Sequence, residues 1–343
     1  MLGWTIPDHR GLGGLRLVEL ADPIAAAGDV VLHLHAAALN PADRYLAEGL
    51  YPARPTFPHV LGRDGSGTIL AVGEGVRGWK PGDRALILRG DTGVTRPGTL
   101  AERVAVAADS LAPVPETYSD LEAAGAALVS LTAHQALLQW GRLAPSVVLV
   151  SGASGGVGVA TVQLAAALGH TVIGLSRSVA KREQLLLLGA TAVLDPRSDC
   201  WRRELKELLA PRRVDLVVDT IGGALFSELV DTLGFEGRVS VVGMLAGPVP
   251  AFNTASLFFR RVRIGGVAVG TDSRDSQAAA WGEVVSLLRI TGSRPVVDSV
   301  FPLEEVPAAF ARLAEGPMGK VIVRMTARAP EAGLHTVGFG GSS

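Results

Sequence analysis

The stretch Val147-Val-Leu-Val-Ser-Gly-Ala-Ser-Gly-Gly-Val-Gly158 decides how most of this chain folds. Its apolar beginning predicts a buried strand, its glycines predict a tight turn, and the apolar residues 159–168 predict a helix. In such a unit the glycines let a pyrophosphate approach the backbone, and the helix N-terminus faces the phosphates. Ala153 occupies the first glycine place of the usual G-x-G-x-x-G pattern. A purely structural turn is therefore the alternative to a dinucleotide site.

The residues on either side of this turn alternate between predicted strands and helices. Apolar residues recur at helical spacing from Asp120 to Leu138. Further strands are predicted at 171–175, 192–194, 214–218, 238–242 and 263–269, with helices from 178, near 201 and 225, and over 278–290. This alternation is typical of a parallel sheet covered by helices, so we predict a doubly wound α/β domain over residues 120–294. The surrounding frame favours the dinucleotide site, with contacts from Gly152, Ser154, Gly155, Gly156 and Val157.

The first third of the chain has the pattern of a β-rich domain. Short strands are predicted at 15–20, 30–38, 65–72, 84–88 and 101–106, and Gly and Pro residues between 73 and 83 predict tight turns. Beyond the second domain, strands at 295–301 and 319–324 flank a helix at 304–313. We infer that the chain returns to the first domain, which then comprises residues 1–119 and 295–326. Residues 327–343 are rich in Gly, Ala and Ser and predict a disordered tail.

Composition excludes several classes of protein. The 343 residues carry 32 Lys plus Arg against 33 Asp plus Glu, so no overall positive field is present to hold a nucleic acid. Cys200 is the one cysteine, which excludes an internal disulfide and favours a reducing, cytoplasmic location. Asp8, His9 and Arg10 stand where a signal peptide would need an apolar core, and the apolar runs are too short to span a bilayer.

The end of the second strand of the doubly wound domain indicates which dinucleotide is bound. An acidic residue there would bind the adenosine ribose, whereas a basic residue accommodates a 2′-phosphate. The chain has Ser176 and Arg177 at this point, and Lys181 follows one helical turn later. We expect both cations to converge on one phosphate, so NADPH is preferred over NADH. A solvated basic helix start is the alternative.

Several stretches make a family resemblance visible. They are Ala38-Leu-Asn-Pro-Ala-Asp43, Leu61-Gly-Arg-Asp-Gly-Ser-Gly67 with Val72-Gly-Glu-Gly75, Lys80-Pro-Gly-Asp-Arg84 and Ser151 to Gly158, joined by Leu131-Thr-Ala133 and Gly319-Lys-Val321. With them the chain resembles the medium-chain dehydrogenase/reductase superfamily, most closely its zinc-free, quinone-oxidoreductase-like branch, over roughly residues 15 to 325. The resemblance implies a GroES-like β-rich domain interrupted by a Rossmann domain, with the active site in the cleft between them.

The resemblance also bears on zinc. Zinc-dependent relatives carry a cysteine three positions before an aspartate, and a Gly-His-Glu motif that supplies another ligand. This chain has Asn40 before Asp43, and Gly62-Arg63-Asp64 in the other place. A guanidinium cannot ligate zinc, and one cysteine cannot form the structural zinc lobe. We therefore expect no metal site.

Without a metal, the resemblance implies hydride transfer to a carbon conjugated with a carbonyl, with protein donors stabilising the negative charge on the substrate oxygen. Asn40, Tyr45 and Tyr51 are the candidate donors. By similarity Asn40 and Asp43 line the cleft, and Tyr45 or Tyr51 donates a hydrogen bond or shields the hydride path. For each tyrosine the alternative is a packed aromatic ring with a satisfied hydroxyl. Arg63 has two interpretations, a salt bridge with Asp64 or Asp43 and recognition of an anionic substrate group.

The same family comparison assigns the nicotinamide half of the cofactor site. Thr132 corresponds to a position near the nicotinamide ribose, although a helix hydroxyl bonded to its own backbone is the alternative. Backbone contacts are expected from the stretches 242–244 and 266–269, and Lys320 corresponds to a residue that often reaches the cofactor. The contacts so assigned are Gly243, Met244, Val267, Val269 and Lys320. The exposed sheet edge at 263–269 is expected to pair with its twin in a homodimer.

The leading functional hypothesis is an NADPH-dependent, zinc-independent oxidoreductase whose substrate is a quinone, an enone or another α,β-unsaturated carbonyl compound. Two alternatives remain. One is zinc-free alcohol or aldehyde oxidoreduction, for which fold analogy alone is a weak argument. The other is an NADPH-binding sensor with little turnover, which predicts cofactor binding without hydride transfer to any enone.

Overall fold

The strand that begins at Val147 lies inside a six-stranded sheet, as this computed structural model of residues 1–251 and 253–325 shows. All neighbouring strands in this sheet are parallel. Their order is β11 (Ala192–Leu194), β10 (Thr171–Leu175), β9 (Val147–Val150), β12 (Val214–Asp219), β13 (Leu233–Val241) and β14 (Arg263–Gly266). This order reverses beside β9, which is the switch point where doubly wound folds bind their ligands.

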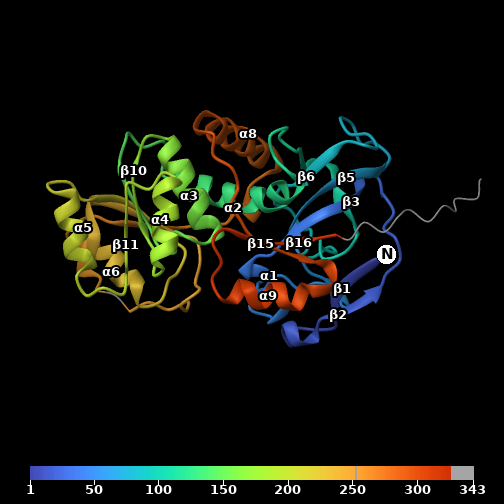
Figure 1. Cartoon of the computed structure of the whole chain (residues 1–343), viewed down its shortest axis with the longest axis horizontal. Helices are drawn as coiled ribbons and strands as arrows, with labels where there is room; N and C mark the ends of the chain where they lie inside the picture. Colours follow the sequence, from blue (N-terminus) through green and yellow to red (C-terminus); the bar gives the residue numbers. More distant parts are fainter. Residues whose placement is uncertain (252, 326–343) are drawn as a thin grey trace, which may run out of the picture.

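Alternate residues of β9 pack on opposite faces of the sheet, as the two-residue strand period requires. Val148 and Val150 face one core, and Val147 and Leu149 face another. Helices cover both faces, and Figure 1 shows them around this half of the molecule: α3 (Gly156–Ala167), α4 (Val179–Leu187), α5 (Trp201–Leu209), α6 (Leu225–Thr232) and α8 (Arg274–Thr291). The predicted parallel α/β fold is confirmed.

The other half of the molecule is built on β-sheets. A sheet runs in the order β15 (Val297–Pro302), β16 (Lys320–Arg324), β3 (Asp29–Ala38), β5 (Asp64–Val72), β6 (Arg84–Ile87), β8 (Leu111–Pro113), and β7 (Arg103–Ala107) also pairs with β3. A smaller sheet contains β2 (Arg16–Glu19), β1 (Leu2–Ile6) and β4 (His59–Val60). β16, from the end of the described chain, pairs with β3 through Ile322 and Ala38. The last described part of the chain, with α9 (Val306–Ala314), therefore lies against the first (Figure 1).

α2 (Asp120–Leu138) connects the two halves. Ser119 caps it, accepting a hydrogen bond from the Glu122 backbone while the Glu122 side chain accepts one from the Ser119 backbone. α2 packs on α3 and α8 and also on β3 and β5. Within the described residues it is the one helix long and apolar enough to cross a membrane, but most of that segment is buried inside the protein. It is a core helix that fixes the two halves to each other.

Several local predictions need correction. β1, β4, β8 and α1 (Pro41–Ala47) were not foreseen, because none is longer than 7 residues and such short segments show no clear period. The strand predicted at 263–269 ends at Gly266, and residues 269–271 form a 3₁₀ turn. The helix predicted at 278–290 begins earlier, at Arg274, because Ser273 caps it. Residue 326 of the first domain and the predicted tail at 327–343 lie outside the described residues.

Candidate active site

The turn after β9 leaves room for a ligand. A Cβ built on Gly155 would meet only the Gly152 carbonyl oxygen, at 3.5 Å, whereas one on Gly158 would stand 2.3 Å from that same oxygen. Gly155 is the N-cap of α3 and offers no side chain to the N–H groups of the first turn. These N–H groups and the open face at Gly155 are the features that bind a pyrophosphate. The predicted dinucleotide cradle therefore fits the structure, and Gly158 serves close packing of helix and turn.

Next to this turn, a buried network of hydrogen bonds connects the end of β9 to the end of β12. The Ser151 hydroxyl donates to Asp219 Oδ1 at 2.5 Å, and the backbone N–H groups of Thr220 and Gly222 donate to the Ser151 hydroxyl and to Asp219. All of these atoms lie at the carboxyl edge of the sheet. The sequence analysis did not predict this network. The polar residues Ser151 and Asp219 at the ends of two buried strands could have indicated it.

The end of β10 shows where a 2′-phosphate could be held. The Arg177 side chain is exposed and makes no hydrogen bond or ion pair within residues 1–251 and 253–325. Lys181 instead donates to the carbonyl oxygen of Gly316, and burial lowers the pKa of Lys181. Ser176 is buried, and its carbonyl oxygen accepts a hydrogen bond from Arg182. Of the two cations, Arg177 has the side chain that the described residues leave unengaged, and the convergence of both on one phosphate stays a prediction.

A buried ionic cluster joins three segments of the chain at Asn40, Asp64 and Lys320. The Lys320 ammonium donates to Asn40 Oδ1 at 2.6 Å, to the Leu39 carbonyl oxygen at 3.0 Å and to Asp64 Oδ2 at 3.1 Å. Both donor hydrogens of the Asn40 amide are used, one by Asp64 at 2.9 Å and one by the Ala38 carbonyl oxygen at 3.3 Å. The geometry does not support Asn40 as a donor to substrate. Asn40 positions Lys320 and Asp64 instead.

Arg63 forms the second buried ion pair. Its Nε donates to Asp43 Oδ1 at 2.9 Å, and its Nη2 donates to the Ala42 carbonyl oxygen at 3.1 Å. Of the two interpretations of Arg63, the salt bridge is present, and its partner is Asp43 rather than Asp64. Burial raises the pKa of Asp43, and the Arg63 guanidinium opposes that rise.

Tyr51 lies against this cluster. The guanidinium carbon of Arg63 is 4.7 Å from the centre of the Tyr51 ring, and Arg89 Nη2 donates to the Tyr51 hydroxyl at 3.3 Å. Burial by itself would raise the pKa of Tyr51, but the charges of Arg63 and Arg89 outweigh it and lower that pKa. A phenol with a lowered pKa is a stronger hydrogen-bond donor. Tyr45 is half-buried, and its ring contacts the Arg44 guanidinium.

The stretches expected beside the nicotinamide follow β13 and β14. Gly243 and Met244 are half-buried in the loop after β13, Val267 donates its N–H to the Val241 carbonyl oxygen, and Val269 is buried. The Thr132 hydroxyl donates to the Leu128 carbonyl oxygen at 2.6 Å, which is the alternative named for it above. Its lone pairs remain able to accept a hydrogen bond from a cofactor hydroxyl.

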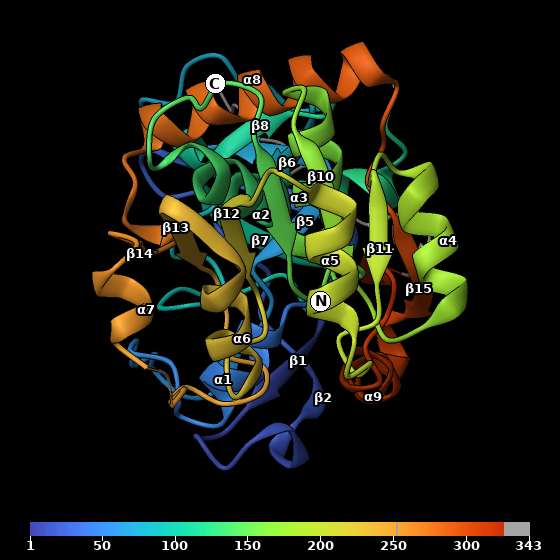
Figure 2. The same ribbon diagram turned by 90° about the vertical axis from the view of Figure 1, so that its left-hand side faces the viewer.

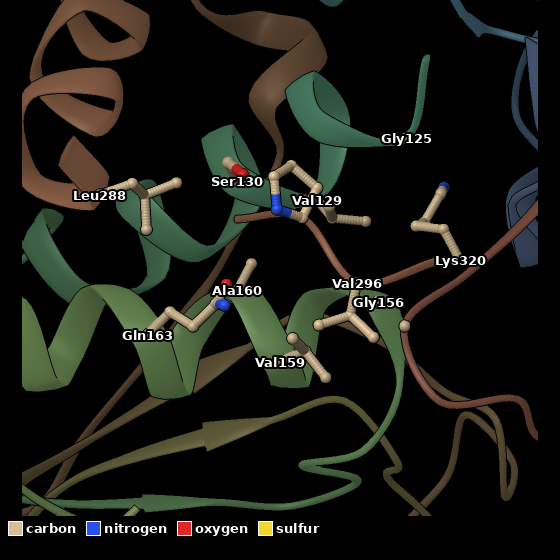
Figure 3. A pocket seen from close by; sticks show the side chains of 12 residues that line it. Gly125, Val129, Ser130, Gly156, Val159, Ala160, Gln163, Leu288, Val296 and Lys320 are labelled. Carbon is tan, nitrogen blue, oxygen red and sulfur yellow. The ribbon is translucent and has the colours of Figure 1, made fainter. Parts of the chain in front are cut away.

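A pocket beside the glycine turn shows how Lys320 reaches the cluster. Figure 3 shows residues of α2, α3 and α8 around it, with Gly156 and Lys320 at one end. A Cβ on Gly156 would stand 3.1 Å from the Lys320 side chain. The stem of Lys320 thus packs on the glycine turn while its ammonium is directed toward Asn40. Lys320 connects the two sites physically.

Comparison with known proteins identifies the family. A model described as "Alcohol dehydrogenase GroES-like domain" matches residues 26–116, and one described as "Zinc-binding dehydrogenase" matches residues 156–288. The chain is 30% identical over 318 residues to quinone oxidoreductase of Rattus norvegicus, covering 91% of this chain and 94% of that protein. The chain belongs to the medium-chain dehydrogenase/reductase superfamily, in its quinone oxidoreductase-like branch.

Solved structures agree with this assignment. This medium-chain dehydrogenase/reductase is similar to Escherichia coli quinone oxidoreductase complexed with NADPH, with a TM-score of 0.85 and 26% identity over 94% of this chain and 100% of that one. It is also similar to an NAD-dependent alcohol dehydrogenase, with a TM-score of 0.86 and 29% identity over 95% of this chain and 100% of that one. The expected GroES-like and Rossmann domains are confirmed, and the chain is an oxidoreductase of this superfamily.

The name of one matching model raises the question of zinc, and the donor set of this medium-chain dehydrogenase/reductase does not fit that metal. Asp43 faces Arg63, and Asp64 faces Lys320, so each carboxylate of the cluster already has a cationic partner. In the described part of the chain no group of three or more His, Cys, Asp or Glu residues could hold a metal ion. Zinc requires several such ligands together.

Arg89 is the residue of the cleft that the sequence interpretation missed. It follows the buried strand β6, in the run Ala85-Leu-Ile-Leu-Arg89, and is itself buried. A cation at the end of an apolar run is a visible signal, but nothing in the sequence says that its side chain meets Tyr51. That contact depends on how two distant segments pack.

Proposed function

We propose that the chain is an NADPH-dependent oxidoreductase that reduces quinones, enones or related α,β-unsaturated carbonyl compounds without zinc. The observation that carries this proposal is the pairing of Arg63 with Asp43 and of Lys320 with Asp64, because these cations already engage both carboxylates, and no group of three or more possible ligands in the described part of the chain could hold a metal. Similarity to a quinone oxidoreductase and to an NADPH complex of such an enzyme supports it.

Different residues of the chain would bind different parts of the cofactor. The N–H groups at the start of α3 and the open face at Gly155 would hold the pyrophosphate, and Arg177 would hold the 2′-phosphate that distinguishes NADPH from NADH. The stretches around Gly243 and Val267 would contact the nicotinamide through the backbone. When bound, the cofactor supplies a hydride to the substrate.

The chain must then stabilise the negative charge that develops on the substrate oxygen. The Tyr51 hydroxyl accepts a hydrogen bond from Arg89, so its own proton is free to be donated. Arg63 and Arg89 strengthen this donor by lowering its pKa. Fixed donors aimed at a developing charge lower the barrier because they need no reorganisation during the reaction. Tyr51, or water beside it, would supply the proton that completes reduction.

The test is NADPH oxidation with a panel of quinones, enones, aldehydes and ketones, with and without a chelator, and with NADH in parallel. We expect turnover with conjugated acceptors, insensitivity to the chelator and preference for NADPH. Loss of activity on chelation would contradict zinc independence. Turnover restricted to saturated aldehydes or alcohols would favour the alternative oxidoreductase. Tight NADPH binding with no turnover on any acceptor would favour a sensor.

A further inference from the structure

Arg89 is a buried cation without a counterion. Only 6% of its surface is exposed, and its Nη1 atom is buried with no hydrogen-bond partner. No carboxylate of residues 1–251 and 253–325 forms an ion pair with it, and its guanidinium donates instead to the neutral hydroxyl of Tyr51. Burying an unpaired charge is costly, so such residues are rare unless a partner completes them.

The neighbouring charges do not supply that partner. Arg63 is matched by Asp43 and Lys320 by Asp64, with nitrogen to oxygen distances of 2.9 and 3.1 Å. Two carboxylates therefore serve two cations, and Arg89 remains as one excess positive charge. Burial and, after it, the Arg63 charge lower the pKa of Arg89, whereas Tyr51 and the Asp64 carboxylate oppose this shift without cancelling it.

The position of Arg89 puts this charge between the two halves of the molecule. On one side its guanidinium meets Tyr51, from the first domain. On the other side it meets the 3₁₀ turn Val269–Thr271, because a Cβ on Gly270 would stand 3.1 Å from Arg89 Nη2. Arg274, at the start of α8, donates to the Arg89 carbonyl oxygen at 2.7 Å and fixes the backbone there. The excess charge thus lies between Tyr51 and the segment assigned to the nicotinamide.

We infer that Arg89 is the recognition site for a carboxylate carried by the substrate, and that the natural acceptors are conjugated carbonyl acids. This inference rests on the proposed function and names its substrate class. A carboxylate bound at Nη1 would neutralise the excess charge and satisfy the orphaned donor together. The Tyr51 hydroxyl would still donate its hydrogen bond to the carbonyl oxygen of the substrate.

The reaction keeps atoms and electrons in balance. A hydride from NADPH forms a C–H bond at the carbon β to the carbonyl, and the carbon–carbon π electrons move onto the carbonyl oxygen. Tyr51 or water donates a proton, the saturated keto acid forms after tautomerisation, and NADP⁺ is released. The carboxylate takes no part in the bond changes, so Arg89 contributes binding and orientation.

The test compares trans-3-benzoylacrylate with its methyl ester, which differ in the negative charge. The variants are Arg89→Met, Arg89→Lys and the control Arg77→Met, which removes an exposed arginine of the same domain. For Arg89→Met we expect kcat/KM with the acid to fall roughly 10- to 100-fold more than kcat/KM with the ester. Both substrates lose the support that Arg89 gives the Tyr51 hydroxyl, but only the acid loses the partner of its charge. Arg89→Lys should show an intermediate loss, since it keeps the charge without the fork. Arg77→Met should match the wild type with both.

A second readout uses no cofactor. The acid, but not the ester, should raise the thermal unfolding midpoint of the wild type, and Arg89→Met should lose this shift. Without ligand, Arg89→Met should unfold at the wild-type temperature or above it, because an unpaired buried charge is removed. A lower midpoint would indicate a structural role and overturn the inference.

The remaining outcomes separate the two proposals. Equal losses with acid and ester in either Arg89 variant would place Arg89 on the carbonyl oxygen and overturn carboxylate recognition. If Arg89→Met fails to fold, Arg89→Lys decides by the same comparison. If none of the acceptors supports NADPH oxidation by the wild type, the proposed function fails. The unfolding shift measured without cofactor still decides whether Arg89 binds a carboxylate.

Discussion

Arg177 illustrates how one exposed residue can set cofactor choice. It lies at the end of β10 with a guanidinium that no group in the described chain engages, while Lys181 is tied to Gly316. A guanidinium can form charge-assisted hydrogen bonds with a 2′-phosphate that NADH lacks. Arg177→Ala should weaken NADPH binding about 10- to 100-fold and leave NADH binding nearly unchanged.

Dissociation constants from calorimetry or fluorescence would measure this effect. Arg203→Ala is the matched control, because Arg203 is an exposed arginine of the same domain, on α5. Equal weakening of NADPH and NADH by the Arg177 change would show that the phosphate is bound elsewhere.

His59 makes stability depend on pH. It is buried, its Nε2 has no hydrogen-bond partner, and burial lowers its pKa to about 4, whereas an unfolded chain restores the ordinary value near 6.5. Between these two values the unfolded chain binds a proton that the folded chain does not. The free energy of unfolding should therefore fall as pH drops from about 6.5 to 4, by up to about 3 kcal/mol from this group, and lose nothing further from it below pH 4.

Urea unfolding of the wild type and His59→Gln at several pH values between 7 and 4 would test this. Glutamine cannot titrate, so the variant should lose less stability than the wild type over that range. Parallel curves for the two proteins would assign the acid sensitivity to other groups.

At the level of elements, the turn between β9 and α3 contains one glycine expected to matter for NADPH binding and another expected to matter for stability. Gly155→Ala should fold normally, since its Cβ meets one atom at an ordinary contact distance, but it should weaken NADPH binding at least about tenfold by filling the cradle. Gly158→Ala should cost about 3 kcal/mol of stability, because its Cβ would overlap the Gly152 carbonyl oxygen and backbone atoms of Ala153.

The two variants are each other's controls. Unfolding midpoints and NADPH titrations should show a binding defect in one and a stability defect in the other. Wild-type NADPH affinity in Gly155→Ala would remove this turn from the cofactor site.

At the level of the whole molecule, the open edge of the six-stranded sheet predicts a homodimer. β14 is the last strand of this sheet, and Figure 2 shows it with α7 (Ala255–Phe258) at one margin of the molecule. Large apolar side chains are exposed on these elements and beside them: Phe235, Phe258, Phe259 and Ile264. An open strand edge beside exposed aromatic residues is suited to pairing with a second copy.

Light scattering coupled to gel filtration should give a dimer mass at micromolar concentration. Ile264→Lys should shift the mass toward that of the monomer, since a charge would be buried in the pair interface. Leu187→Lys, which alters an exposed leucine on α4, is the control and should remain dimeric. A monomeric wild type would remove this prediction.

The sequence by itself determined the order of the elements. Glycines around 155 and the alternation of strands and helices depend on local spacing, so the doubly wound domain, the bridging helix from Asp120 and the β-rich first third could all be predicted. Short elements such as β1 and α1 were not predicted, because 5 or 7 residues are too few to show a clear period. The salt bridge of Arg63 was foreseen as one alternative, but its partner was not decided.

Only the tertiary structure decided which charges meet. Asn40, Asp64 and Lys320 come from three separate segments, and their contacts engage the Asn40 amide, which was expected to face the substrate. Arg89 reaches Tyr51 across 38 positions of sequence and is left without a counterion. Local spacing specifies helices and strands because their hydrogen bonds are local, whereas the pairing of buried charges depends on packing between segments that the sequence keeps apart.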